Sequence, residues 1–162
     1  MVDNIIMKKI NILFVCLGNI CRSPMAEGVL NSLIREAGYD NYIKVDSAAT
    51  HNYHNNLAPD RRACMTASSH GIDITRQRSR QISDHDFAKF DLIFSMDKSI
   101  HNNLLRRSKE NDYKIKQIAD CIKEFDCHYI PDPYYGDLND FEDTFALIKK
   151  AMEALLIDLI NK

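Results

Sequence analysis

Blocks of apolar and polar positions divide the amino-acid sequence into alternating strands and helices. A near-continuous apolar run at residues 10–15 predicts a strand that is buried on both faces, as in parallel sheets. Apolar residues then recur at helical spacing over residues 25–37. Ser23 is the expected N-cap of this helix, Pro24 suits its first turn, and Gly38 is a plausible stop.

The same alternation continues to the end of the chain. Further strands are predicted at residues 42–47, 91–95 and 114–119, and further helices at residues 59–70, 98–107 and 141–159. Strands that alternate with helices predict an α/β fold in which a parallel sheet is covered on both faces. In such folds, ligands bind beyond the carboxyl ends of the strands.

The length and composition are those of one globular domain, residues 1–162, with residues 1–8 as an N-terminal extension. Hydrophobic residues make up 45% of the chain and charged residues 27%, as is usual for soluble proteins. The formal net charge of -2 provides no overall attraction for nucleic acid or for an anionic membrane. Any attraction for phosphate must therefore be local.

The apolar run near the N-terminus is not typical of a signal peptide. It is short, and it is followed by Gly18, Asn19 and Arg22 rather than by a small-residue cleavage site. We therefore expect a cytoplasmic protein without membrane insertion, whose five cysteines are reduced. The cysteines contain no C-x-x-C pair and the six histidines show no ligand spacing, so we expect no metal.

The most informative motif lies between the first strand and the first helix. It reads Cys16-Leu17-Gly18-Asn19-Ile20-Cys21-Arg22-Ser23, and no other cysteine of the chain has an arginine six positions later. Left-handed angles at Gly18 and Asn19 would turn the N–H groups of residues 17–21 inward, where the helix N-terminus also favours an anion. Arg22 would add a two-pronged clamp. The motif predicts a phosphate-binding cradle.

Cys16 is the candidate nucleophile of this cradle. The positive surroundings would favour its thiolate, which is the form that attacks phosphorus. Ser23 could donate a hydrogen bond to the sulfur and help it leave in a second step. The alternative is a small buried cysteine at the end of a strand.

Asp132 is the candidate general acid for a leaving oxygen. Two flanking prolines restrict its backbone, and Tyr134 and Tyr135 follow at once. Together with Tyr53, these tyrosines could form the sides of a slot for a phenyl phosphate. The alternatives are an ordinary Asp-Pro turn and surface tyrosines.

Several arginines lie outside these motifs. We expect solvated faces for Arg61, Arg62, Arg76, Arg78, Arg80, Arg106 and Arg107, some of which could meet acidic substrate segments.

These motifs resemble those of the low-molecular-weight protein tyrosine phosphatases over nearly the whole chain. The matching segments are residues 15–27, 46–48, 90–91, 95–97 and 132–136. The resemblance implies a three-layer α/β/α sandwich with a central parallel four-stranded sheet and no cofactor. It implies hydrolysis of phosphotyrosine in proteins, and of small aryl phosphates, through a cysteinyl-phosphate intermediate.

The resemblance also implies roles for individual residues. Cys16 would be the nucleophile, Arg22 would bind phosphate, and Asp132 would act as acid and then as base. Asn19 and Ser47 would support the loop.

Two positions depart from the pattern of the family. Tyr53 stands where the family often has tryptophan, and Gln77 stands where it often has histidine. The first departure concerns substrate preference, and the second concerns support of the loop.

Two other functions and one further role stay open. The first is a thioredoxin-coupled arsenate reductase that uses Cys121 and Cys127 as a relay. The second is a phosphotyrosine-binding regulator without turnover. Cys21 either protects an oxidised Cys16 by forming a disulfide with it, or packs under the loop.

Overall fold

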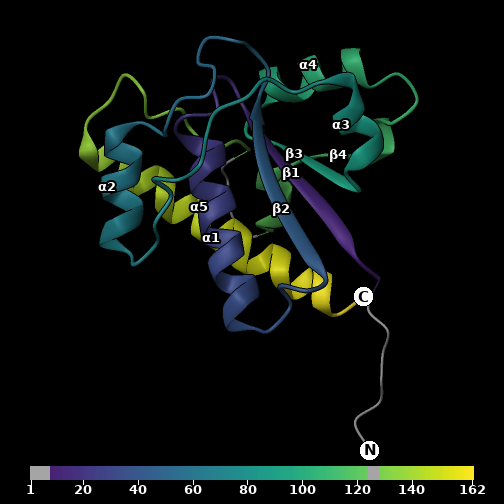
Figure 1. The fold of residues 1–162 in the computed structure, drawn as a ribbon, viewed down its shortest axis with the longest axis horizontal. Coiled ribbons are helices and arrows are strands. Elements are labelled where there is room, and N and C mark those ends of the chain that lie inside the picture. The colour runs from purple at the N-terminus through teal and green to yellow at the C-terminus, as the bar shows by residue number, and fades with distance from the viewer. Residues whose placement is uncertain (1–7, 124–127) are drawn as a thin grey trace, which may run out of the picture.

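A four-stranded parallel sheet lies at the centre of the molecule, in the strand order β2-β1-β3-β4 (Figure 1). The computed structural model describes residues 8–123 and 128–162, so residues 1–7 of the expected N-terminal extension lie outside the described residues. The strands are β1 (Ile10–Cys16), β2 (Ile43–Ala49), β3 (Leu92–Ser95) and β4 (Ile115–Gln117). Every adjacent pair is parallel, as the sequence predicts.

Helices cover both faces of the sheet (Figure 1). They are α1 (Arg22–Glu36), α2 (Arg61–Ser69), α3 (Asp84–Lys89), α4 (Lys98–Ser108) and α5 (Leu138–Ile160), with the short 3₁₀ helices η1 (Asp112–Lys114) and η2 (Ile118–Cys121). Helices α1, α2 and α5 lie on one face, whereas α3 and α4 lie on the other. The predicted three-layer α/β/α sandwich is confirmed.

Strand β1 is buried on both faces because its side chains alternate between two cores. Ile12 and Phe14 point into the core under α1 and α5, and Phe14 stacks on Phe94 at 5.7 Å between ring centroids. Leu13 and Val15 point into the smaller core under α3 and α4. The apolar run that forms β1 thus contributes side chains to both cores, and this packing fixes the position of its carboxyl end.

The sequence prediction is wrong at three places in the fold. Helix α3 was not predicted, because six residues are too few to show helical periodicity. Strand β4 is shorter than predicted, since η1 and η2 occupy the residues on either side. Ser23 is not an N-cap: Cys21 holds that position without a side-chain cap, and Ser23 lies inside α1.

None of the helices among residues 8–123 and 128–162 is long and apolar enough to span a membrane.

Candidate active site

Asn19 and Gly18 determine the conformation of the loop between β1 and α1, Asn19 through its backbone angle and Gly18 through its lack of a side chain. Asn19 has a φ of 57°, in the left-handed region that asparagine tolerates, as predicted. Gly18 does not have the predicted positive φ. A Cβ atom at Gly18 would lie 3.1 Å from Cδ2 of His54, so this glycine makes room for the His54 ring.

The loop carbonyls are held away from its centre by hydrogen bonds. The carbonyls of Cys16, Leu17 and Ile20 accept from the backbone N–H groups of Thr50, His51 and Asp60, at 2.8–3.2 Å. The C=O and N–H of a trans peptide point in opposite directions. The N–H groups that follow these carbonyls, those of Leu17, Gly18 and Cys21, therefore point away from Thr50, His51 and Asp60. Separately, the N–H of Asn19 donates to Cys16 Sγ at 3.2 Å.

Arg22 lies beneath this loop and is only 3% exposed. Its Nη1 donates to Asp97 Oδ2 at 2.7 Å and to the carbonyl of Ile130 at 3.0 Å. Its Nη2 lies 3.4 Å from Asp132 Oδ2. Burial alone would lower the pKa of Arg22, but the charges of Cys16, Asp97 and Asp132 outweigh burial and raise it. Arg22 is therefore a fixed positive charge beside Cys16.

Asp132 faces Arg22 from the loop that precedes α5. Its side chain is 38% exposed, and its Oδ1 accepts from the N–H of Tyr134 at 3.2 Å. Arg62 holds the same loop, because it donates to the carbonyls of Tyr134 and Gly136 at 2.9 and 3.1 Å. Arg62 is 32% exposed, so it faces solvent as predicted, but it also fixes the backbone that carries Asp132, which the sequence does not predict.

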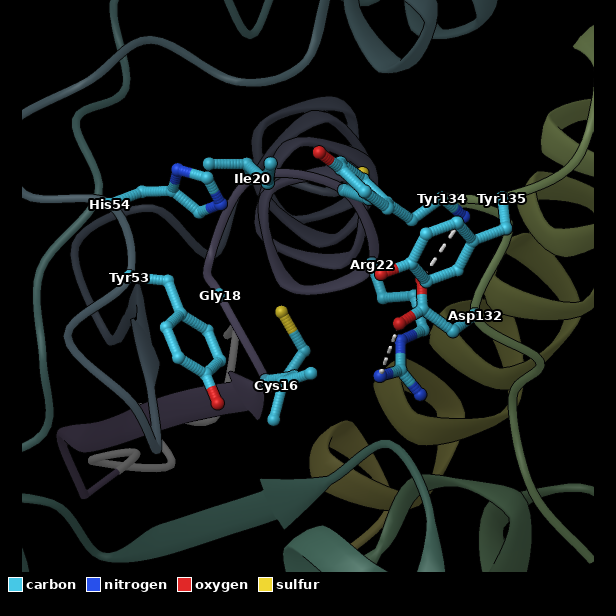
Figure 2. A pocket seen from close by; sticks show the side chains of 11 residues that line it. Cys16, Gly18, Ile20, Arg22, Tyr53, His54, Asp132, Tyr134 and Tyr135 are labelled. Carbon is cyan, nitrogen blue, oxygen red and sulfur yellow. Dashed lines mark hydrogen bonds and ion pairs between the residues drawn. The ribbon is translucent and has the colours of Figure 1, made fainter.

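A pocket of about 300 Å³ opens above Cys16 (Figure 2). Tyr53 and His54 lie on one side of Cys16, and Asp132, Tyr134 and Tyr135 lie on the other (Figure 2). The lining residues are Cys16, Leu17, Gly18, Ile20, Cys21, Arg22, Tyr53, His54, Asp132, Tyr134 and Tyr135. All of them except His54 are site residues that the sequence predicts.

The remaining predicted residues, Asn19 of the loop itself, Ser23 and Ser47, do not line the pocket. Ser23 Oγ lies 3.0 Å from Cys16 Sγ, within hydrogen-bond distance, as the sequence predicts. Asn19 Nδ2 donates to Ser23 Oγ at 2.8 Å and to Ser47 Oγ at 2.9 Å. Its Oδ1 accepts from the N–H of Arg80 at 3.1 Å. These contacts hold Asn19 in its left-handed conformation.

Four residues of this environment were missed from the sequence: Glu27, His54, Arg80 and Asp97. Glu27 accepts from Ser47 Oγ, and the Arg80 guanidinium is bound between Asp46 and Asp86. Arg80 is thus a partly exposed residue that also makes two ion pairs, which the sequence does not predict. Except for Asp86, six residues after Arg80, the partners named here lie far away in the sequence, so local spacing carries little signal for them. Glu27 and Asp97 do lie in segments that match the family pattern, residues 15–27 and 95–97.

Gln77, the second departure from the family pattern, also lies behind the site. Its Nε2 donates to the carbonyl of Pro24 at 3.0 Å, and its Oε1 is buried without a hydrogen-bond partner. It therefore supports the first turn of α1 rather than the loop itself.

The cysteines of the described part of the chain are free thiols: Cys16, Cys21, Cys64 and Cys121. Burial, followed by the charge of Asp60, raises the pKa of Cys21, so this thiol is protonated. Cys121 packs against the core under α1 and α5, and burial raises its pKa to about 12. Cys127 lies outside the described residues. Within residues 8–123 and 128–162, no three His, Cys, Asp or Glu side chains are placed to hold a metal ion.

Comparisons with known proteins find similar sequences and structures along nearly the whole chain. The sequence model of the low molecular weight phosphotyrosine protein phosphatases matches residues 11–162. The human low molecular weight phosphotyrosine protein phosphatase is 39% identical, over 90% of this chain and 93% of its own. The Entamoeba histolytica protein tyrosine phosphatase crystallised with Hepes in its active site has a TM-score of 0.91 and 35% identity, covering 94% of this chain and 98% of its own. Bacillus subtilis YfkJ has a TM-score of 0.90 and 35% identity, covering 95% and 96%.

Proposed function

The chain belongs to the low molecular weight phosphotyrosine protein phosphatase family, and we propose that Cys16, Arg22 and Asp132 carry out its hydrolysis of phosphotyrosine. One observation carries the assignment of these residues. Cys16 Sγ accepts from the N–H of Asn19, and it lines one pocket together with Arg22 and Asp132, whose side chains lie 3.4 Å apart.

The first step transfers the phosphoryl group to the enzyme. The Cys16 thiolate attacks phosphorus while the loop N–H groups and Arg22 bind the non-bridging oxygens, where charge builds up in the transition state. The bond to the tyrosine oxygen breaks, and Asp132 gives its proton to that oxygen. The products of this step are a cysteinyl-phosphate and a free tyrosine side chain.

The second step restores the enzyme. The Asp132 carboxylate takes a proton from water, whose oxygen attacks phosphorus and displaces the Cys16 sulfur. Ser23 Oγ, 3.0 Å from that sulfur, donates a hydrogen bond to the departing thiolate. Inorganic phosphate then leaves, and Asp132 is again protonated for the next cycle.

The pocket walls suit an aryl phosphate. Tyr53 and Tyr134 flank the opening, and stacking of aromatic rings favours a substrate phenyl group between them. We propose phosphotyrosine-containing proteins as the substrates and small aryl phosphates as further ones. We also propose that residues 1–162 form a single phosphatase domain in the cytoplasm, which the free thiols of the described residues support.

The test measures hydrolysis of p-nitrophenyl phosphate, a phosphotyrosine peptide and the matched phosphoserine peptide, each with EDTA present. We expect hydrolysis of the two aryl phosphates, unaffected by EDTA, and little hydrolysis of phosphoserine. A parallel assay follows thioredoxin-coupled reduction of arsenate. Arsenate reduction without aryl phosphate hydrolysis would favour the reductase, and binding of phosphotyrosine without any turnover would favour the regulator.

A further inference from the structure

Arg62, the second residue of α2, joins the loop of Cys16 to the loop of Asp132. Its Nε and Nη2 donate to Oδ1 and Oδ2 of Asp60, each at 3.0 Å. The backbone N–H of Asp60 donates in turn to the carbonyl of Ile20, in the Cys16 loop, at 2.8 Å. The two parallel hydrogen bonds to one carboxylate fix the plane of the guanidinium. The guanidinium is therefore fixed relative to the Cys16 loop.

The same guanidinium holds the Asp132 loop on the side that leads into α5. Nη2 donates to the carbonyl of Tyr134 at 2.9 Å, and Nη1 donates to the carbonyl of Gly136 at 3.1 Å. The guanidinium carbon also lies 4.6 Å from the ring centroid of the buried Phe141, an arrangement that favours a cation. All these donors lie in one plane on one side chain, which the single ammonium group of a lysine cannot reproduce.

The backbone at Tyr134 determines where the Asp132 carboxyl lies. The N–H of Tyr134 donates to Asp132 Oδ1 at 3.2 Å, and Arg62 holds the carbonyl of the same tyrosine. The chain before Asp132 has its own anchor, because Thr144 Oγ1 donates to the carbonyl of Pro131 at 3.3 Å. Arg62 anchors the other side. The Asp132 side chain is 38% exposed, so packing alone does not fix it, and its position depends on these anchors.

We propose that Arg62 is a positioning residue for the general acid: it fixes the place of the Asp132 carboxyl relative to Cys16 and so governs proton transfer to the leaving oxygen. This inference rests on the proposed role of Asp132. The transfer requires the carboxyl to lie within hydrogen-bond reach of that oxygen while Cys16 attacks phosphorus. Without Arg62, the carboxyl occupies this place for only part of the time. The leaving group must then depart without a proton, which is most difficult when its phenol is weakly acidic.

The test compares kcat/KM for phenyl phosphate with kcat/KM for p-nitrophenyl phosphate, because this constant includes the step in which the leaving oxygen takes the proton. The main variant is Arg62→Met, whose apolar side chain can still pack on Phe141. We expect its kcat/KM for phenyl phosphate to fall about 10- to 100-fold, the usual effect of misplacing a reacting group. The loss for p-nitrophenyl phosphate should be smaller, since p-nitrophenolate leaves more readily without a proton.

A second variant, Arg62→Lys, keeps the positive charge but not the planar set of donors. It should show the same dependence on the leaving group, and it serves for the comparison if Arg62→Met does not fold. Arg61→Ala, at the exposed neighbouring position of α2, should keep the wild-type kcat/KM for both substrates. Competitive inhibition by inorganic phosphate should be as strong in Arg62→Met as in the wild type, because Arg22 and the Cys16 loop still bind phosphate.

The Asp132→Asn background separates positioning of the acid from a general effect on structure. The acid is already absent there, so adding Arg62→Met should cause no further loss that depends on the leaving group. Equal losses for the two substrates in Arg62→Met and Arg62→Lys, with Asp132→Asn dependent on the leaving group, would overturn the inference. An Asp132→Asn variant without that dependence would instead overturn the proposed role of Asp132.

Discussion

Replacing Asp97 by Asn tests whether Arg22 must be held by an anion. Asp97 has two functions that can be separated: Oδ2 accepts from Arg22 Nη1 at 2.7 Å, and Oδ1 caps α4 by accepting from the N–H of Ile100 at 2.9 Å. Asparagine keeps an oxygen for the cap. It places an NH₂ group against the guanidinium, where no hydrogen bond can form.

The expected loss of stability follows from the burial of Arg22. A hydrogen bond to a charged group contributes about 1.5–3 kcal/mol. In the variant, Arg22 keeps the Ile130 carbonyl and Asp132 as partners. The decrease in the free energy of unfolding should therefore stay below the approximately 3–5 kcal/mol that an unpaired buried charge costs. We therefore expect Asp97→Asn to lower the free energy of unfolding by about 1.5–3 kcal/mol. A misdirected Arg22 should also lower kcat/KM about 10- to 100-fold, the usual effect of misplacing a group that positions the substrate.

The assays are urea unfolding and p-nitrophenyl phosphate kinetics on the same preparations. Asp97→Ala removes the cap as well, so it should be about 1 kcal/mol less stable than Asp97→Asn. Asp137→Asn is the matched control, because Asp137 caps α5 on the surface. The free energy of unfolding of this variant should fall by no more than about 1 kcal/mol. An Asp97→Asn protein with wild-type stability and wild-type kcat/KM would refute the reasoning.

Three further predictions concern the acid, the second cysteine of the loop and the packing behind it. Asp132→Asn should lower kcat by about 10²–10⁴ for poor leaving groups and by less for acidic ones; a loss independent of leaving-group pKa would make Asp132 structural. After brief peroxide treatment followed by dithiothreitol, the wild type should recover activity, because the Cys16 sulfenic acid condenses with the Cys21 thiol to a disulfide and water. The Cys21→Ser variant cannot form this disulfide and should stay inactive. Equal recovery of both proteins, without a cross-linked peptide, would leave Cys21 as packing. Gly28→Ala should cost about 1–3 kcal/mol in urea unfolding, because its Cβ would lie 2.5 Å from Ile74 Cγ2; a wild-type midpoint would contradict this.

The predictable part of the site is the part that is continuous in sequence. The loop from Cys16 to Arg22 can be interpreted from its own residues, since the strand before it and the helix after it fix where the motif lies. Asp132 and its two tyrosines form a second short motif. Because ligands of parallel sheets bind beyond the carboxyl ends of the strands, both motifs are expected to lie at that edge of the sheet. The sequence therefore predicts nearly the whole pocket lining.

The parts that escaped prediction depend on contacts between distant segments. In the sequence, Arg62 and Arg80 cannot be distinguished from surface arginines, yet each binds groups that come from elsewhere in the chain. Glu27 is polar on a largely buried stretch of helix, and only the fold shows that Ser47 meets it. For Ser23, two local rules compete: the cap preference favours the helix end, whereas the loop conformation directs the hydroxyl to Cys16.

The central claim is that Cys16 carries the phosphoryl group during turnover. The most direct measurement quenches the enzyme with denaturant during hydrolysis of p-nitrophenyl phosphate and locates the phosphoryl group by peptide mass. We predict one phosphoryl group on the peptide that contains Cys16 in the wild type. We also predict no measurable turnover for Cys16→Ser, although that variant should still bind vanadate through the loop N–H groups and Arg22. A phosphoryl group on another residue, or turnover of Cys16→Ser within about tenfold of wild type, would contradict the account.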